Sequence, residues 1–304
     1  MKFLKKINVS PKKKILITGA NSYIGTSVER WLNNQEGSYE VDTLDLKNEK
    51  WTRYDFSSYD VIYHVAGIAH ADTGRVTEET KKLYYSVNTD LAIKVAKKAK
   101  EEGVNQFIFM SSMIVYSGCK QDMITSDTIP VPLNFYGDSK LQADIQLEKL
   151  RDDSFKVVIL RPPMIYGKGS KGNYPRLAKL ASRLWLFPMV KNERSMLHID
   201  NLCEFVKLMI DNQESGIFFP QNSEYVNTSN MVKQIAEVKK HKIHIVKGFN
   251  WCIKLITRCP GKIGNITSKV FGSSIYSKEM SIYKNGDYQI RTFEESIQLT
   301  EGEI

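Results

Sequence analysis

Short apolar runs alternate with longer segments of mixed polarity through the first half of the chain. The first run, Ile15 to Ile17, is rich in β-branched residues and is soon followed by Gly19, which is typical of a buried parallel strand. In the next segment, Ile24, Val28 and Leu32 recur at the spacing of a helix face. The same patterns predict strands over residues 12–18, 39–46, 59–66, 105–111 and 155–161, and helices over 22–33, 78–102 and 136–151.

This alternation of strand and helix determines the expected architecture. Helices of this length serve as crossover connections, which join neighbouring strands in parallel. We therefore expect an α/β fold with a Rossmann-like, doubly wound parallel sheet. After residue 165 the alternation weakens, residues 167–173 are loop-like, and further helices are expected over 175–186, 200–211 and 229–239.

The chain is expected to divide into three parts. Residues 1–13 form a basic N-terminal extension, residues 14–166 a dinucleotide-binding domain, and residues 167–304 mainly a smaller α/β C-terminal lobe that binds substrate. Segments of this last part can return to the sheet. Ligands of open α/β sheets bind at the carboxyl ends of the strands, and this is where the lobe is expected to join.

Composition agrees with a globular chain. Of its 304 residues, 42% are hydrophobic and 25% are charged, which is enough apolar material for a packed core. No apolar run is long enough to span a bilayer, and the basic N-terminus lacks the apolar stretch of a secretory signal. None of the four cysteines forms a C-x-x-C pair, and His241 and His244 have no acidic partner nearby in sequence. We therefore expect a cytoplasmic location, no integral membrane segment and no metal site.

The net charge of +9 raises the question of an anionic partner. The basic residues are scattered and are not interleaved with aromatic residues on one evident face, so nucleic acid is not the expected partner. Residues 249–256, which include Trp251, could lie on a membrane surface, but a buried helix is favoured there. The basic surface is expected to be solvated, with a few charges recruited to phosphates.

The segment from Thr18 to Gly25 has the composition of a phosphate-binding turn. It stands between a strand and a helix, so its backbone N–H groups and the helix N-terminus can face a pyrophosphate. Ser22 occupies the middle position, where a G-x-x-G-x-x-G spacing would have glycine. The residues expected to bind a dinucleotide here are Gly19, Asn21, Ser22, Tyr23, Ile24 and Gly25.

Asp45 stands at the end of the second predicted strand, 20 residues beyond Gly25. A carboxylate there can accept hydrogen bonds from the adenosine ribose and repels a 2′-phosphate, which favours NAD over NADP. Lys47 stands nearby, so NADP is kept as an alternative cofactor. Further cofactor contacts are expected near the adenine and under the cofactor, from Asp55, Phe56, Ala66 and Gly67.

Tyr136 and Lys140 stand one helical turn apart at the start of a predicted helix. A free phenol has a pKa of about 10, and a nearby ammonium favours the phenolate, so this pair can move a proton to or from a hydroxyl beside a nicotinamide. Tyr116 and Lys120 show the same spacing, but no amphipathic helix begins there. We therefore predict Tyr136 and Lys140 as the proton-transfer pair.

Taken together, these motifs resemble the extended short-chain dehydrogenase/reductase family, in its branch of nucleotide-sugar epimerases and ketoreductases of capsule or O-antigen synthesis. The resemblance covers nearly the whole chain and implies a UDP-sugar substrate and a homodimer formed through residues 78–102 and 136–151. It implies that Ser112 is the catalytic hydroxyl that joins Tyr136 and Lys140. It also implies cofactor contacts from Asn88 and Pro163, and substrate contacts from Tyr116, Asn173 and Arg194. Other segments that carry it are His64-Val65-Ala66-Gly67, Ser111 to Tyr116 and Leu160 to Gly167.

The family's 4,6-dehydratases have an Asp-Glu pair directly after the catalytic hydroxyl, where this chain has Met113 and Ile114. Neither side chain can carry a proton, so dehydration is not expected. Two activities at sugar C4 remain, namely reduction of a UDP-4-keto-6-deoxy-HexNAc and 4-epimerisation of a UDP-hexose or UDP-HexNAc with retained NAD. The short second lobe slightly favours the reductase. A redox-inactive, NAD-binding regulatory protein is a third interpretation, which the intact Ser112, Tyr136 and Lys140 set disfavours.

Overall fold

The computed structural model describes residues 12–35, 37–69, 77–248 and 272–302. Six parallel strands form the central sheet in the order β10-β6-β4-β3-β1-β2. The chain winds outward from β1 to β2 and then returns to the other side of β1, so the switch point of this doubly wound sheet lies between β1 and β3. The strands are β1 (Lys13–Thr18), β2 (Tyr39–Leu44), β3 (Val61–His64), β4 (Gln106–Met110), β6 (Lys156–Leu160) and β10 (Gly216–Phe218).

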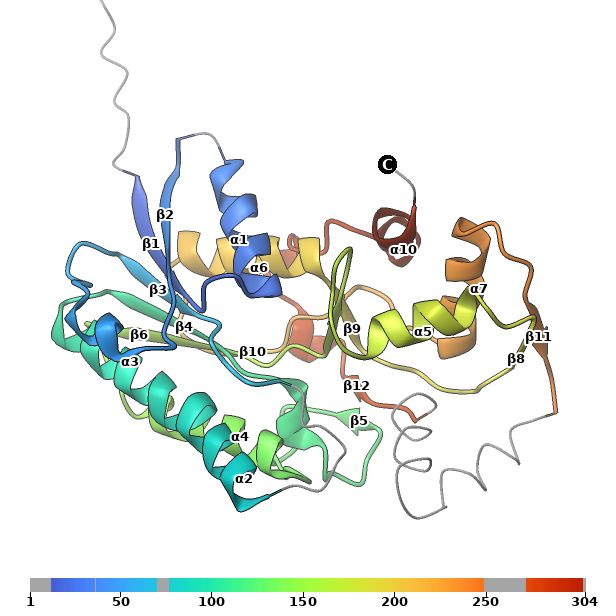
Figure 1. The fold of residues 1–304 in the computed structure, drawn as a ribbon, viewed down its shortest axis with the longest axis horizontal. Coiled ribbons are helices and arrows are strands. Elements are labelled where there is room, and N and C mark those ends of the chain that lie inside the picture. The colour runs from blue at the N-terminus through green and yellow to red at the C-terminus, as the bar shows by residue number, and fades with distance from the viewer. Residues whose placement is uncertain (1–11, 36, 70–76, 249–271, 303–304) are drawn as a thin grey trace, which may run out of the picture.

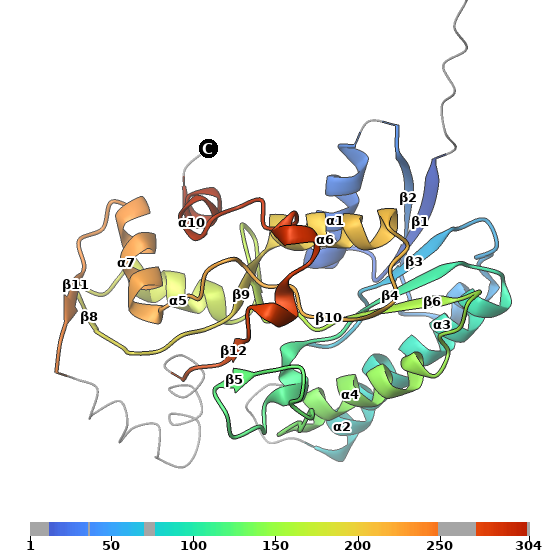
Figure 2. The ribbon, with the colours of Figure 1, turned by 180° about the vertical axis from the view of Figure 1, so that it is seen from behind.

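Helices cover both faces of this sheet (Figures 1 and 2). One face carries α1 (Tyr23–Asn33) and α6 (Ile199–Asp211). The other face carries α2 (Glu78–Tyr85), α3 (Leu91–Glu101) and α4 (Phe135–Glu148). Because successive side chains of a strand point to opposite faces, Ile15 and Ile17 of β1 pack with α1 and α6, whereas Leu16 packs with α3 and α4.

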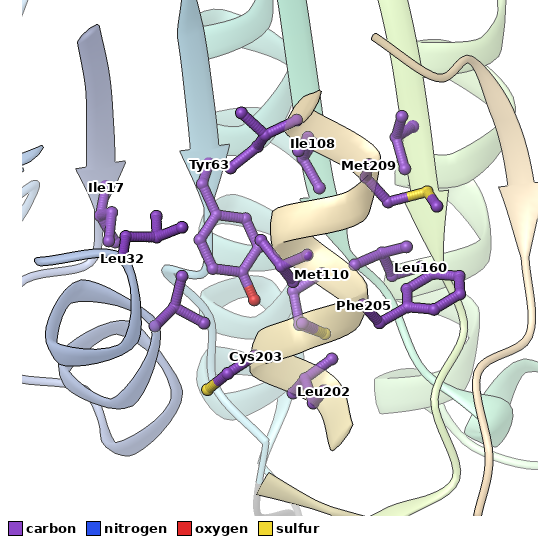
Figure 3. Packing of buried hydrophobic residues seen from close by; sticks show 14 of the residues in the cluster. Ile17, Leu32, Tyr63, Ile108, Met110, Leu160, Leu202, Cys203, Phe205 and Met209 are labelled. Atoms are coloured by element: carbon purple, nitrogen blue, oxygen red, sulfur yellow. The ribbon is translucent and has the colours of Figure 1, made fainter. Parts of the chain in front are cut away.

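Figure 3 shows the core beneath α6. Leu202, Phe205 and Met209 of this helix are fully or almost fully buried, and they lie over strand residues such as Tyr63 and Ile108. Both α6 and β10 come from the half of the chain assigned mainly to the second lobe. Segments of that half therefore lie in the sheet and on one of its faces.

The remaining elements form a second lobe beyond the carboxyl ends of the strands (Figure 1). Its core joins α5 (Asn173–Ala181), α7 (Thr228–Val238) and α10 (Phe293–Glu301). Strands of two or three residues pair within and beside it, and they are too short to show a periodic pattern in the sequence. They are β5 (Met123–Ile124) with β12 (Ile275–Tyr276), β7 (Met164–Tyr166) with β9 (Met196–His198), and β8 (Leu186–Pro188) with β11 (His244–Val246).

The predicted helices match the structure to within a few residues, with two differences. The segment expected as one helix over 78–102 contains a π-helical turn at Ser86–Asp90, between α2 and α3. The helix expected over 175–186 ends at Ala181, because the chain enters β8 at Leu186. Within the described ranges, no helix has the length and apolarity needed to cross a membrane. Short 3-10 helices lie at Glu49–Arg53, Met113–Tyr116, Glu279–Ser281 and Lys284–Gly286.

Candidate active site

The turn after β1 brings two strand ends into close approach. Gly19 has a φ of +112°, and a β-carbon on it would lie 2.7 Å from the backbone nitrogen of Ala66. Asn21, two residues on, also has a left-handed backbone with a φ of +62°. The Ala66 N–H donates to the Thr18 carbonyl (3.0 Å), which ties the end of β3 to that of β1. Only glycine suits position 19 in this arrangement.

Ser22, the departure from the expected glycine, caps helix α1. Its Oγ accepts a hydrogen bond from the Gly25 N–H at 3.1 Å. Gly25 is buried, and a β-carbon on it would lie 2.7 Å from that same oxygen. Because the cap uses the Gly25 N–H, the N–H groups of Tyr23 and Ile24 remain for a ligand at the positive end of the helix dipole. This turn therefore fits a dinucleotide pyrophosphate held by backbone N–H groups.

The residues expected near the adenosine differ in their exposure to solvent. Asp45 is exposed directly after β2, where its Oδ1 accepts a hydrogen bond from the Lys47 N–H (2.9 Å). Asp55 is also exposed, and its Oδ1 accepts from the Ser57 N–H (2.8 Å). The Phe56 ring is fully buried in the core, with the Lys98 ammonium 5.1 Å from its centroid. A ring contact between Phe56 and adenine is thus closed off, because packing against α3 takes up that ring.

Tyr136 and Ser112 meet at the carboxyl end of the sheet. Asn134 caps α4 by accepting from the Gly137 N–H (3.0 Å), which sets Tyr136 in the first turn of this helix. Burial raises the pKa of Tyr136 to about 12, and a hydrogen bond with Ser112 opposes that rise. The tyrosine keeps partial solvent exposure, so a ligand has access to it.

Lys140 lies one turn further along α4, in the core of the protein. Its Nζ donates to the Met110 carbonyl at 2.8 Å and lies 4.6 Å from the centroid of the Phe109 ring. Burial lowers the pKa of Lys140 to about 8. The lysine was expected to lower the pKa of Tyr136, but Ser112 is the group that does so here. The reason is that the ammonium faces the end of β4.

Gly67 and Asn88 surround the same ammonium. A β-carbon on Gly67 would lie 3.2 Å from Lys140 Nζ and 3.1 Å from Asn88 Oδ1. Asn88 belongs to the π-helical turn, and it holds both backbone polar groups of Ile68, at 2.8 Å for the N–H and 3.1 Å for the carbonyl. Its Nδ2 also donates to Ser139 Oγ at 3.1 Å. Asn88, in the π-helical turn, therefore joins the loop after β3 to α4.

A buried ion pair lies behind Lys140, and sequence reasoning missed it. Asp144 Oδ2 accepts from Arg161 Nε at 2.9 Å, and the two side chains are 2% and 7% exposed. Arg161 also donates to the Tyr116 hydroxyl at 2.7 Å, while Tyr276 donates to the Arg161 carbonyl at 2.9 Å. The network fixes α4 against the end of β6 and against β12 of the second lobe. Its signal in the sequence was the four-residue spacing of Asp144 from Lys140.

The expected substrate residues lie in different settings. Tyr116 is buried, and its hydroxyl is engaged by Arg161, so the structure favours a packing role for it. Asn173 is exposed at the start of α5. Arg194 is half-buried and burial lowers its pKa, while its backbone pairs with Val226. Pro163 is buried between β6 and β7, next to the strand end that carries Arg161.

Histidine and cysteine side chains of the described ranges form no cluster of metal ligands, and His241 bonds the Leu184 carbonyl at 3.0 Å. His64 is buried, its pKa is lowered by burial to about 3, and its Nδ1 pairs with the Thr18 hydroxyl at 2.8 Å. It is therefore a neutral link between β1 and β3. The segment 249–256 lies outside the described residues.

Comparison with known proteins decides which family has this arrangement. Residues 15–219 match the model of the NAD-dependent epimerase/dehydratase family. The chain belongs to this family. The match confirms the resemblance to extended short-chain dehydrogenase/reductases that the motifs indicated, and with it a nicotinamide cofactor.

Two curated proteins that are similar to this chain over most of its length are 4-epimerases. The chain is 28% identical over 287 residues to UDP-glucose 4-epimerase of Vibrio cholerae, a match that covers 86% of each chain. It is 22% identical over 304 residues to N-acetyl-alpha-D-glucosaminyl-diphospho-ditrans,octacis-undecaprenol 4-epimerase of Escherichia coli O157:H7, covering 90% of this chain and 89% of that protein. The chain is thus an enzyme of the NAD-dependent epimerase/reductase family.

Solved structures share the fold over almost the whole length. A dTDP-4-dehydrorhamnose reductase from Clostridium acetobutylicum superposes with a TM-score of 0.70 at 19% identity, covering 94% of this chain and 97% of that one. The UDP-glucuronic acid 4-epimerase of Bacillus cereus in complex with NAD gives 0.66 at 17% identity, covering 95% and 97%. The expected Rossmann-like fold is confirmed. Reductases and epimerases share it, so the fold does not separate the two activities.

Proposed function

We propose that this enzyme exchanges a hydride and a proton at C4 of a UDP-sugar, with Ser112, Tyr136 and Lys140 as its catalytic residues. The observation that carries the proposal is the contact between Tyr136 and Ser112 at the carboxyl edge of the sheet, with Lys140 one helical turn behind and a turn that fits a pyrophosphate after β1. Met113 and Ile114, which follow Ser112 directly, have no proton to give. The site is thus suited to redox at C4 and lacks the acid pair that elimination of water requires.

The residues would divide the work as follows. The turn from Gly19 to Gly25 holds the dinucleotide, which supplies or accepts the hydride when bound. Tyr136 gives a proton to the C4 oxygen or removes one from it, and Ser112 holds that oxygen by hydrogen bonding. Lys140 places a positive charge behind them, at a point fixed by the Met110 carbonyl.

Two activities use this arrangement, and different observations favour each. Similarity to 4-epimerases over most of the chain favours an epimerase that retains NAD. The short second lobe favours the reductase. We place the epimerase first, since whole-chain similarity to two 4-epimerases is the more direct support. Reduction of a UDP-4-keto-6-deoxy-HexNAc in surface polysaccharide synthesis is the second candidate.

Product analysis separates the two activities. The enzyme is incubated with UDP-GlcNAc or UDP-glucose alone, and separately with a UDP-4-keto-6-deoxy-HexNAc and NADH or NADPH. Interconversion of the C4 epimers without added reductant identifies the epimerase. Loss of reduced-nicotinamide absorbance in proportion to product identifies the reductase. Absence of both reactions contradicts the proposal.

Replacement of Asp45 tests the cofactor preference. Asp45→Ala removes the charge that would repel a 2′-phosphate, so the ratio of the NAD and NADP dissociation constants is expected to shift toward NADP by about tenfold. Isothermal titration with each cofactor measures the ratio. Glu49→Ala removes an exposed charge four residues further on and is expected to leave the ratio unchanged. An unchanged ratio in Asp45→Ala would place the ribose elsewhere.

The homodimer stays a prediction. Leu83 on α2 and Ile145 on α4 are 53% and 43% exposed, so each of the two expected interface segments carries an outward apolar side chain. Light scattering is expected to give twice the 34.9 kDa mass of one chain. A monomeric mass would contradict this part of the proposal.

A further inference from the structure

The end of the second lobe carries a cluster of exposed apolar side chains. β8 and β11 lie at the end of the molecule's long axis, away from the central sheet (Figures 1 and 2). Here Leu180, Leu184, Trp185 and Leu186 are 41%, 37%, 72% and 59% exposed. Phe187, the next residue of β8, is buried. Because successive side chains of a strand point to opposite sides, Leu186 points outward. Four large apolar side chains therefore reach solvent within seven residues.

Cations surround this cluster. Arg176, Lys179 and Arg183 are exposed on or just after α5, the helix that leads into the cluster. Lys240 and Lys242 are exposed on the segment before β11. That segment touches the cluster directly, because His241 Nε2 lies 3.0 Å from the Leu184 carbonyl and the His241 ring meets the Trp185 ring edge-on at 6.3 Å. We call these five cations and four apolar residues the basic apolar patch.

The two chain segments that build the patch contain no carboxylate. No Asp or Glu occurs between Asp153 and Glu193, or between Glu237 and Glu279. The nearby ion pairs, Lys233 with Glu237 and Lys239 with Glu301, use lysines outside the patch. Within the described part of the chain, none of the five patch cations forms an ion pair. The patch therefore presents positive charge that the fold does not neutralise.

We propose that the basic apolar patch docks this enzyme on an anionic phospholipid bilayer. Tryptophan and leucine side chains favour the boundary between headgroups and acyl chains, and lysine and arginine favour the anionic surface next to it. The patch offers both kinds of side chain side by side. A soluble polyanion would bind the cations of the patch but would make no favourable contact with the exposed side chains of Leu186 and Trp185. The proposal does not depend on the reaction at C4, because it concerns a different end of the molecule.

Vesicle sedimentation of the full chain tests this proposal. Vesicles of phosphatidylcholine alone are compared with vesicles of phosphatidylcholine and phosphatidylglycerol in equal parts. The protein is expected to bind the anionic vesicles at least about tenfold more tightly. Trp185→Ser combined with Leu186→Ser is expected to weaken that binding about tenfold. Lys179→Gln, Arg183→Gln and Lys242→Gln together are expected to weaken it on the order of a hundredfold.

Matched controls remove similar groups elsewhere. Ile129→Ser removes a side chain that is 78% exposed, and Lys50→Gln, Lys94→Gln and Lys149→Gln together remove three exposed cations of the sheet domain. Both are expected to bind like the unaltered protein, and circular dichroism checks that every variant is folded. Equal binding to both vesicle types, or no binding to either, overturns the proposal. So does a loss in the charge variant with none in the Trp185 and Leu186 variant, because charge alone would then hold the protein to the vesicles and the apolar side chains would not enter the bilayer.

Discussion

Replacing Tyr136 with phenylalanine is expected to lower turnover by about three orders of magnitude, while binding of NAD is retained. In the proposed mechanism the hydroxyl exchanges a proton with the substrate, and the ring alone keeps the packing of Tyr136 against Tyr84, whose ring centroid lies 6.0 Å away. Steady-state turnover on the substrate found by product analysis measures the first effect. Calorimetric titration with NAD measures the second.

The second Tyr-x-x-x-Lys match in the sequence, Tyr116 with Lys120, provides the control. Lys140→Met is expected to lower turnover strongly, whereas Lys120→Met is expected to leave it unchanged because Lys120 is exposed outside the site. Tyr116→Phe is expected to retain turnover and to lose some stability, since its hydroxyl accepts from Arg161 in the core. Retained turnover in Tyr136→Phe would contradict the assignment of the proton-transfer residue.

Replacing Asp144 with alanine is expected to lower the free energy of unfolding by about 3–5 kcal/mol. The change leaves the Arg161 guanidinium buried without its carboxylate, and that uncompensated charge is the source of the cost. Burial is the largest influence on Asp144 and raises its pKa despite the nearby Arg161. The intact pair therefore adds little to stability, although breaking it is costly. Urea unfolding at neutral pH measures the difference.

Two further variants separate this explanation from a general effect of lost charge. Asp144→Leu combined with Arg161→Met removes both charges and is expected to unfold less readily than Asp144→Ala. Glu40→Ala breaks the exposed pair with Lys14 and is expected to cost less than about 1 kcal/mol. A cost for Asp144→Ala as small as that for Glu40→Ala would show that water reaches Arg161 in the folded protein.

Local sequence signals predicted the sheet and the catalytic helix well. The β-branched runs before Gly19 and before Arg161 are buried strands, because strands covered on both faces need continuous apolar residues. Helix context also selected Tyr136 over Tyr116, and the structure places Tyr136 in the first turn of α4 and Tyr116 in a buried network. Here a pattern over a dozen residues was sufficient.

Features that depend on distant partners could not be predicted. The π turn at Asn88 is maintained by contacts with Ile68 and Ser139, which are remote in sequence. Phe56 is expected from the sequence to lie near the adenine, and the structure shows its ring fully buried against α3. Asp144 was overlooked because a charge on a helix is usually solvated. Asp144 shares the buried face of α4 with Lys140, Ala143 and Leu147. The burial of Lys140 and Asp144 becomes evident only once the apolar residues of that face are seen to be buried.

The return of α6 and β10 to the sheet has a consequence for how the enzyme is made. A ribosome has synthesised five of the six sheet strands by Leu160, but the helix that covers Tyr63, Ile108 and Leu160 ends only at Asp211. A nascent chain of that length would expose an apolar sheet face beside α1. The dinucleotide-binding half therefore cannot finish folding before much of the second lobe has emerged, and chaperone binding during synthesis should concentrate in this interval.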